Sequence, residues 1–317
     1  MSRPLVSILI PCYNAAPYLG DTLDSAFAQT HPDVEIILVD DGSSDGSLEI
    51  ARAREPRIRV LAGPQRGASA ARNAATKESR GEFLQYLDAD DLLLPDAVAA
   101  RVRQLSESGA DVACEDWRRI FRQPDGSWTQ GPIESADYRR FDEAPDLAIF
   151  NGFWAPPAAL LYRRSIVEKI GGWNPTLPVI QDARFLFDAA FCGAKFVHVP
   201  GDGAHYRQHS ADSLSSRSKA RFWADVLKNI RDIEEMLLGA GRMDLARRNA
   251  VGRAYALGAR VTFRIDRDLY HANLENLRRF PEQPWSPYLR GAHGVERILG
   301  YTAAVRMMGI LRPGQNP

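Results

Sequence analysis

Residues 6–14 read Val-Ser-Ile-Leu-Ile-Pro-Cys-Tyr-Asn, an apolar run that passes without a break into a polar loop. A run this short, rich in β-branched residues and closed by proline, predicts a buried strand. The next segment, residues 17–29, places Leu19, Leu23 and Phe27 at helical spacing. A strand followed by a helix is the unit from which parallel sheets are built.

The same alternation continues through the first hundred residues, so we expect an α/β fold with a doubly wound, mostly parallel sheet. Ligands of such sheets gather beyond the carboxyl ends of the strands, where loops meet helix amino termini with unpaired N–H groups. Further strands are expected at 35–39, 58–61 and 83–87, and helices at 47–54, 68–79 and 95–108.

The pattern changes in the second half of the chain. Residues 117–145 look irregular, with a hairpin-turn signal at Asp125-Gly126. From about Arg217 the apolar spacing is that of long helices, which places a boundary near Ser215. Between these regions we expect strands at 158–162 and 195–199 and helices at 165–170 and 182–192.

Composition excludes several classes of protein. Forty basic and forty acidic residues cancel, so no general charge attracts nucleic acid or anionic lipid. Three widely separated cysteines predict free thiols in a reducing compartment. No apolar stretch approaches the ~18 residues of a membrane span, and the amino terminus lacks a signal-peptide core. We expect a cytoplasmic protein, at most peripheral at the inner face of the membrane.

Three aspartates follow the strand expected at 83–87: Asp88, Asp90 and Asp91. Carboxylates this close repel one another unless a cation lies between them. An oxygen-only set suits Mg²⁺ or Mn²⁺ that takes its remaining ligands from water and phosphate. The alternative is a cluster that caps the helix after Pro95 and complements its dipole.

Other polar residues follow the neighbouring strands. Asp40 and Asp41 lie in an acidic turn, where a carboxylate can accept hydrogen bonds from a nucleobase or ribose, and Tyr13 can stack on the same base. The alternative is a turn followed by a capped helix. Arg66 and Arg72 are placed to reach phosphate oxygens, although surface arginines are common.

Taken together and in this order, the four loops resemble glycosyltransferase family 2, whose members have the GT-A fold and invert the transferred sugar. The resemblance spans about residues 4–215 and rests on four segments, 6–14, 37–46, 67–73 and 81–91. It implies a catalytic domain at 1–215, divided into a nucleotide-sugar half (1–115) and an acceptor half (116–215), followed by a helical subdomain (216–317).

The resemblance also implies roles for individual residues. Tyr13 and Asp41 bind the base, Arg72 neighbours the diphosphate, and Asp88-Ala89-Asp90 is the metal-binding DXD element. Asp90 is the expected principal metal ligand. Pro11, Asp40 and Arg66 complete the expected nucleotide-sugar site.

The acceptor side is expected to carry the general base. In the family, this carboxylate follows a Gly-Gly-aromatic turn; here residues 171–173 precede Gln181-Asp182, which indicates Asp182. Trp154 and Trp173 are candidate sugar platforms, with buried core aromatics as the alternative. His209, in a polar loop, is a candidate third metal ligand, with a solvated loop histidine as the alternative.

We therefore expect an inverting glycosyltransferase that uses a nucleotide-sugar donor, UDP- or dTDP-linked, and Mg²⁺ or Mn²⁺. The acceptor is a saccharide, a lipid-linked or a protein-linked hydroxyl, and the pathway is cell-surface polysaccharide or glycoconjugate synthesis. The alternatives are a nucleotidyltransferase and a non-catalytic sugar-nucleotide-binding protein. The apolar stripe at 293–311 suits a helix that packs on this chain or on a second copy in a homodimer, or one that docks on a membrane surface.

Overall fold

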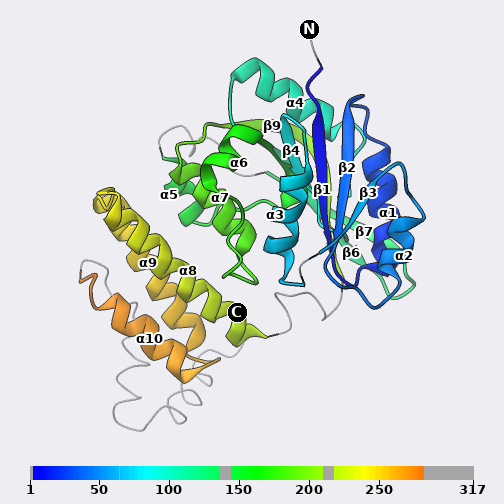
Figure 1. Cartoon of the computed structure of the whole chain (residues 1–317). Helices are drawn as coiled ribbons and strands as arrows, with labels where there is room; N and C mark the ends of the chain where they lie inside the picture. The colour runs from blue at the N-terminus through cyan, green and yellow to red at the C-terminus, as the bar shows by residue number, and fades with distance from the viewer. Residues whose placement is uncertain (1–2, 64, 136–143, 210–217, 282–317) are drawn as a thin grey trace. The chain divides into compact units, whose positions relative to one another are not determined.

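The structure is a computed structural model that describes residues 3–63, 65–135, 144–209 and 218–281 (Figure 1). The chain divides into two compact units, residues 1–211 and 212–317. The first unit is built around one nine-stranded sheet, and the described part of the second is helical.

The first half of the sheet is parallel, as the alternating pattern predicts. β1 pairs with β2 and β4, and β2 pairs with β3, all in parallel. The carboxyl ends of these strands therefore share one edge, and the four loops after them converge there. The strands are β1 (Val6–Cys12), β2 (Val34–Asp40), β3 (Arg59–Ala62) and β4 (Phe83–Tyr86).

The second half of the sheet is mixed. β8 pairs antiparallel with both β4 and β6, whereas β6 runs parallel to β9. The full order is β3-β2-β1-β4-β8-β6-β9-β5, with β7 paired to β6 outside this path. The strands are β5 (Leu92–Leu93), β6 (Val112–Arg122), β7 (Trp128–Glu134), β8 (Leu160–Arg163) and β9 (Phe196–Gln208).

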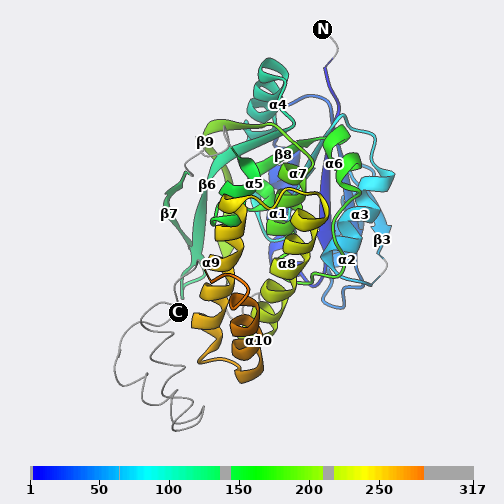
Figure 2. The same ribbon diagram turned by 90° about the vertical axis from the view of Figure 1, so that its left-hand side faces the viewer.

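Helices cover both faces of the sheet. Figures 1 and 2 show α1 and α2 on one face and α3, α6 and α7 on the other. This is the doubly wound arrangement. The helices of this unit are α1 (Ala16–Phe27), α2 (Ser47–Arg52), α3 (Ala68–Glu78), α4 (Ala97–Ser108), α5 (Pro145–Phe150), α6 (Arg164–Ile170) and α7 (Gln181–Phe191).

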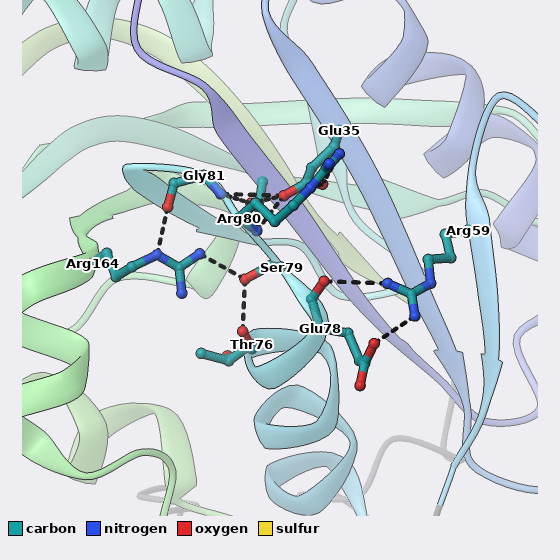
Figure 3. Close-up of polar contacts among 9 residues, drawn as sticks. Glu35, Arg59, Thr76, Glu78, Ser79, Arg80, Gly81 and Arg164 are labelled. Carbon is teal, nitrogen blue, oxygen red and sulfur yellow. Dashed lines mark hydrogen bonds and ion pairs between the residues drawn. The ribbon is translucent and has the colours of Figure 1, made fainter.

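The amino-terminal edge of the sheet is closed by a polar network (Figure 3). Glu35 accepts the backbone N–H groups of Arg80 and Gly81, at 2.6 and 3.2 Å. Arg164 donates to the Gly81 carbonyl at 2.6 Å and to the Ser79 hydroxyl at 2.9 Å. These bonds join α3, α6 and the start of β4, so this edge is structural while the opposite edge carries the loops.

The second unit contains three described helices, α8 (Lys219–Gly239), α9 (Leu245–Thr262) and α10 (Arg267–Leu277). α9 packs on both neighbours. Ile230 and Ile233 of α8 are buried, as the apolar spacing of long helices predicted from about Arg217 implies. Within the described residues, no helix combines the length and apolar composition needed to cross a bilayer. The helix expected at 293–311 lies outside the described residues.

Two sequence interpretations are wrong. The region from residue 117 is not irregular, because β6 and β7 form a hairpin there, with the predicted turn at Asp125-Gly126 between them. The strand expected at 195–199 continues to Gln208, so part of the predicted polar loop is strand. The charged residues of β6 and the glycines at 201 and 203 of β9 hid these strands in the sequence.

Candidate active site

Asp41 ties the second loop of the carboxyl edge to the third. Its Oδ1 accepts the Gln65 N–H at 2.7 Å, and its Oδ2 accepts the Gly67 N–H at 2.8 Å. Asp41 is buried, whereas Tyr13, just past β1, is 57% exposed. Both residues expected to bind a base therefore lie at this edge, one as an exposed ring and one as a carboxylate that shapes the loop.

The other residues expected around the donor differ in exposure. Pro11 and Ala89 are buried, and Arg66 is exposed. The Asp40 carboxylate accepts backbone N–H groups from residues 42–43, at 3.2 and 3.1 Å. These are turn-forming bonds, so Asp40 stabilises its own loop.

Arg72, on α3, is a buried cation beside the acidic run. Its Nη2 donates to Asp88 Oδ1 at 2.5 Å, and its guanidinium lies 4.3 Å from the centre of the Trp173 ring. The Arg72 Nε and Nη1 atoms are buried and have no hydrogen-bond partner. Unpaired buried donors are uncommon in proteins, and here they are consistent with a site completed by an anionic ligand.

Asp90 has a different partner from Asp88. Its Oδ2 lies 2.7 Å from His209 Nε2, and the His209 ring stacks on Tyr18 at 4.4 Å. The side chains of Asp88 and Asp90 are 27% and 37% exposed. Two accessible carboxylates and an imidazole thus lie at the expected metal position.

The described residues contain no group of three or more His, Cys, Asp or Glu side chains spaced to enclose a metal ion. Mg²⁺ does not need such a cage, because it is commonly held by one or two carboxylates together with water and substrate phosphates. Asp88 and Asp90 fit that kind of site.

Asp91 differs from its two neighbours because it is fully buried. Its Oδ1 accepts the backbone N–H of Arg207 at 2.9 Å. Burial, together with the charges of Asp90 and Asp88, raises the pKa of Asp91 well above its ordinary value. The capping alternative is not observed for Asp91, since its carboxylate joins the acidic run to β9.

Asp182 lies in the first turn of α7, close enough to Arg72 and Asp88 to be influenced by their charges. Its Oδ2 accepts the Trp154 Nε1–H at 2.6 Å, and its Oδ1 accepts the Ala183 N–H at 2.8 Å. Burial raises the pKa of Asp182; the two hydrogen bonds and the charge of Arg72 oppose that rise, and Asp88 adds to it. A carboxylate with a raised pKa is a stronger base than an ordinary aspartate.

The turn before α7 is fixed by Asn73 of α3. Asn73 Oδ1 accepts the Trp173 N–H at 2.8 Å, and its Nδ2 donates to the Trp173 carbonyl at 2.9 Å. Trp173 is only 3% exposed and stacks on Phe185 at 4.1 Å. The structure thus shows Trp173 as a buried aromatic, the alternative to the predicted sugar platform.

Gln181 and Trp154 also have different surroundings. Gln181 is buried, and its Oε1 accepts the Ser69 hydroxyl at 2.5 Å, so it packs α7 against α3 and does not face solvent. Trp154 is half-buried, with its ring edge-on to Trp117 at 5.4 Å and to Tyr206 at 5.5 Å. Trp154 is therefore the predicted acceptor-side aromatic that lies beside Asp182.

Sequence reasoning missed Arg207. This buried residue donates to the Asp90 carbonyl at 3.2 Å and to Asp21 at 2.7 Å, and its backbone holds Asp91. Tyr206, its neighbour, contacts Trp154 from the other face of the strand. Residues 205–209, His-Tyr-Arg-Gln-His, carry no apolar alternation, so no sequence signal indicated this role.

The model of Glycosyl transferase family 2 matches residues 7–171, and the match includes the first four strands and the acidic run. The chain belongs to glycosyltransferase family 2. Membership makes this protein an enzyme that transfers sugar to an acceptor, and it favours glycosyl transfer over nucleotidyl transfer or a non-catalytic role.

Relatives of this family 2 glycosyltransferase include the uncharacterized glycosyltransferase alr2836 of Nostoc sp. It is 30% identical over 261 residues, which are 76% of this chain and 79% of that protein. Chondroitin synthase of Pasteurella multocida is 39% identical over 127 residues, 39% of this chain but 13% of that enzyme. Relatives thus include a polysaccharide synthase, of which this chain matches a small part.

Solved structures show the same fold. TarS of S. aureus in complex with UDP superposes with a TM-score of 0.65 at 18% identity, over 98% of this chain and 92% of that one. The mannosyltransferase PcManGT of Pyrobaculum calidifontis, in complex with GDP-Man and Mn²⁺, superposes with a TM-score of 0.55 at 18% identity. The superposition covers 98% of this chain and 86% of that one. At these identities the likeness concerns the fold, and the predicted GT-A fold with carboxyl-terminal helices is confirmed.

Proposed function

We propose that this family 2 glycosyltransferase is an inverting, metal-dependent enzyme that takes its sugar from a UDP- or dTDP-linked donor. The observation that carries the proposal is the placement of Asp182. Its carboxylate has a raised pKa, is held by two N–H groups, and lies within the electrostatic influence of Arg72 and Asp88. A proton acceptor and a site for anionic oxygen are therefore adjacent.

The donor site is assigned to the carboxyl ends of β1, β2 and β4. Tyr13 supplies an exposed ring for the base, and Arg72 supplies guanidinium N–H groups for the diphosphate. Asp41 keeps the third loop in place through the Gln65 and Gly67 N–H groups. We assign donor binding to residues 1–115.

The metal is assigned to Asp90 and Asp88, with His209 beside Asp90. A bound Mg²⁺ or Mn²⁺ supplies positive charge that stabilises the departing diphosphate. The donor set fits such an ion, and Mn²⁺ occurs with GDP-Man in the structure of the fold relative PcManGT. Arg72, bonded to Asp88, adds the chain's own positive charge.

Asp182 is assigned as the general base. Its carboxylate accepts the proton of the acceptor hydroxyl while that oxygen forms a bond to the anomeric carbon. The bond from that carbon to the diphosphate oxygen breaks on the opposite face, and the nucleoside diphosphate leaves with its electron pair. One displacement of this kind inverts the anomeric centre. Orientation of the two substrates supplies much of the rate.

The acceptor is assigned to the side that carries Asp182 and Trp154, formed by residues 116–215. We propose a saccharide or a lipid- or protein-linked acceptor in cell-surface polysaccharide or glycoconjugate synthesis. A relative named chondroitin synthase supports a polysaccharide product. The helical residues 216–317 are assigned to homodimer contacts or to peripheral docking on a membrane.

The donor is identified first, by measuring the melting temperature with UDP-glucose, UDP-galactose, UDP-N-acetylglucosamine, GDP-mannose and dTDP-rhamnose, each with and without Mn²⁺. A ligand that binds only the folded state raises that temperature by mass action. A UDP- or dTDP-sugar that stabilises the protein only with Mn²⁺ supports the proposal. Stabilisation by GDP-mannose alone would overturn the donor assignment.

The general base is tested with Asp182→Asn. We expect transfer to fall by about 10²- to 10⁴-fold, the usual contribution of a general base, while donor affinity is unchanged. Asp188→Asn is the matched control, since it makes the same change on the same helix at a residue paired with Arg184. Wild-type transfer by Asp182→Asn would refute the assignment, and NMR of the product gives the anomeric configuration.

A further inference from the structure

Trp154 makes the one side-chain hydrogen bond to Asp182 that the described structure gives, from its Nε1–H to Asp182 Oδ2 at 2.6 Å. It lies in the loop between α5 and the short 3₁₀ helix Pro157–Ala159, far in sequence from α7. The indole nitrogen can only donate a hydrogen bond, so Asp182 Oδ2 must be the acceptor. The direction of the contact is therefore fixed.

The indole is held by two other rings. Trp117 of β6 and Tyr206 of β9 meet it edge-on, at 5.4 and 5.5 Å, and also meet each other at 5.9 Å. Three rings from separate elements thus form one cluster beside Asp182. Such edge-to-face contacts stabilise a defined ring orientation, which keeps the N–H aimed at the carboxylate.

Both oxygens of Asp182 are therefore tethered, Oδ2 by Trp154 and Oδ1 by the Ala183 N–H at 2.8 Å. Each oxygen has a second lone pair for another donor. A carboxylate fixed at two points has little freedom to rotate, so its remaining lone pairs have a set direction.

We propose that Trp154 is a positioning residue that orients the Asp182 carboxylate toward the acceptor hydroxyl through its indole N–H. This inference rests on the proposed role of Asp182 as the general base. It assigns Trp154 a task beyond lining the acceptor side, because Trp154 acts on the reaction through Asp182.

The charged and titratable groups that influence the charge of Asp182 lie on or just after four elements of the fold. Arg72 of α3 and Asp88 after β4 influence it with opposite signs. The charge of Asp182 adds to the rise that burial causes in the pKa of Tyr162 on β8 and of Tyr206 on β9. Among these influences, the Trp154 bond favours the ionised carboxylate and so lowers the pKa of Asp182.

The first test is Trp154→Phe, which keeps an aromatic ring in the cluster and removes the N–H. With the UDP-sugar that stabilises the protein, we expect kcat to fall by about 10- to 100-fold, the cost of a loosened catalytic geometry, with unchanged donor KM. The acid limb of the pH profile of kcat/KM moves to higher pH, because the carboxylate loses a donor that favours its charged form.

Trp117→Phe is the control, because it also replaces an indole in the ring cluster, keeps an aromatic ring there and removes no donor to Asp182. If the ring cluster has only a structural role, Trp154→Phe and Trp117→Phe should have the same acid limb in the pH profile of kcat/KM. A shift only in Trp154→Phe supports the proposal. Unchanged kcat and an unchanged acid limb in Trp154→Phe would overturn it.

The double variant Asp182→Asn/Trp154→Phe separates this inference from the proposed function. If Trp154 acts through Asp182, the Phe substitution has little further effect once Asp182 is Asn, and the two changes are not additive. Additive losses would overturn the positioning role. Full transfer by Asp182→Asn alone would instead overturn the proposed base.

A measurement without substrate completes the test. In ¹⁵N-labelled protein, the indole N–H resonance of Trp154 is assigned by its disappearance in Trp154→Phe. We expect this resonance to titrate with pH and to move in Asp182→Asn, since its acceptor changes from a carboxylate to an amide. A resonance that is unaffected by both would contradict the bond.

Discussion

Gly171 and Gly172 allow the turn before α7 to be tested with two neighbouring alanines. Both glycines have positive φ, +84° and +98°. A Cβ on Gly171 meets nothing within 4 Å, whereas a Cβ on Gly172 would lie 2.7 Å from Asn73 Oδ1. The two substitutions thus share the backbone strain and differ in one contact.

The expected losses of stability follow from that difference. Alanine at a left-handed position costs about 1–2 kcal/mol, so Gly171→Ala lowers the free energy of unfolding by this amount. Gly172→Ala also displaces Asn73, which makes two hydrogen bonds to the Trp173 backbone. At about 1 kcal/mol for each bond, the second variant loses roughly 1–2 kcal/mol more than the first.

Urea unfolding of the full chain, followed by tryptophan fluorescence and far-UV circular dichroism, measures both losses. The same clash displaces the turn that leads to Asp182, so we also expect Gly172→Ala to lose more transfer activity than Gly171→Ala. Equal losses of stability in the two variants would refute the role assigned to Asn73.

Two further predictions concern the metal and the core. Removal of divalent cations with EDTA abolishes transfer and Mn²⁺ restores it, while Asp90→Asn raises the Mn²⁺ concentration needed for half-maximal rate; full activity in EDTA would contradict the metal assignment. Arg101→Ala leaves the buried Glu115 without its 2.7 Å ion pair and costs about 3–5 kcal/mol in urea unfolding. The exposed Arg103→Ala on the same helix changes stability by less than about 0.5 kcal/mol, and a similar loss in both would contradict the argument.

Much of the first half of the fold follows from local sequence. Strands such as β1 and β4 are buried throughout, so most of their side chains are apolar, interrupted only by Ser7 and Gln85, and a single segment reveals them. β7 has no such signal, because most of its side chains are exposed. β9 is interrupted in sequence by Pro200 and by glycines, which resemble a turn, yet it pairs along β6 past an irregularity in register.

The candidate site is predictable in its residue types and less so in its contacts. Asp88, Asp90 and Asp182 each follow from a short motif, and the structure places Asp182 within reach of the Asp88 charge. The bond between His209 and Asp90 joins residues 119 positions apart, and only the fold reveals it. The same holds for Trp154 and Asp182, whose pairing depends on how three elements pack.

β9 contributes to both sides of the sheet at successive residues. Tyr206 contacts Trp154 on one face, and Arg207 reaches Asp21 and the Asp90 carbonyl on the other. A mutation that shifts this strand therefore disturbs the contact with Trp154 and the bonds to Asp21 and Asp90 together. A substitution in the loop that carries Trp154 acts directly on only one of these two sets of contacts.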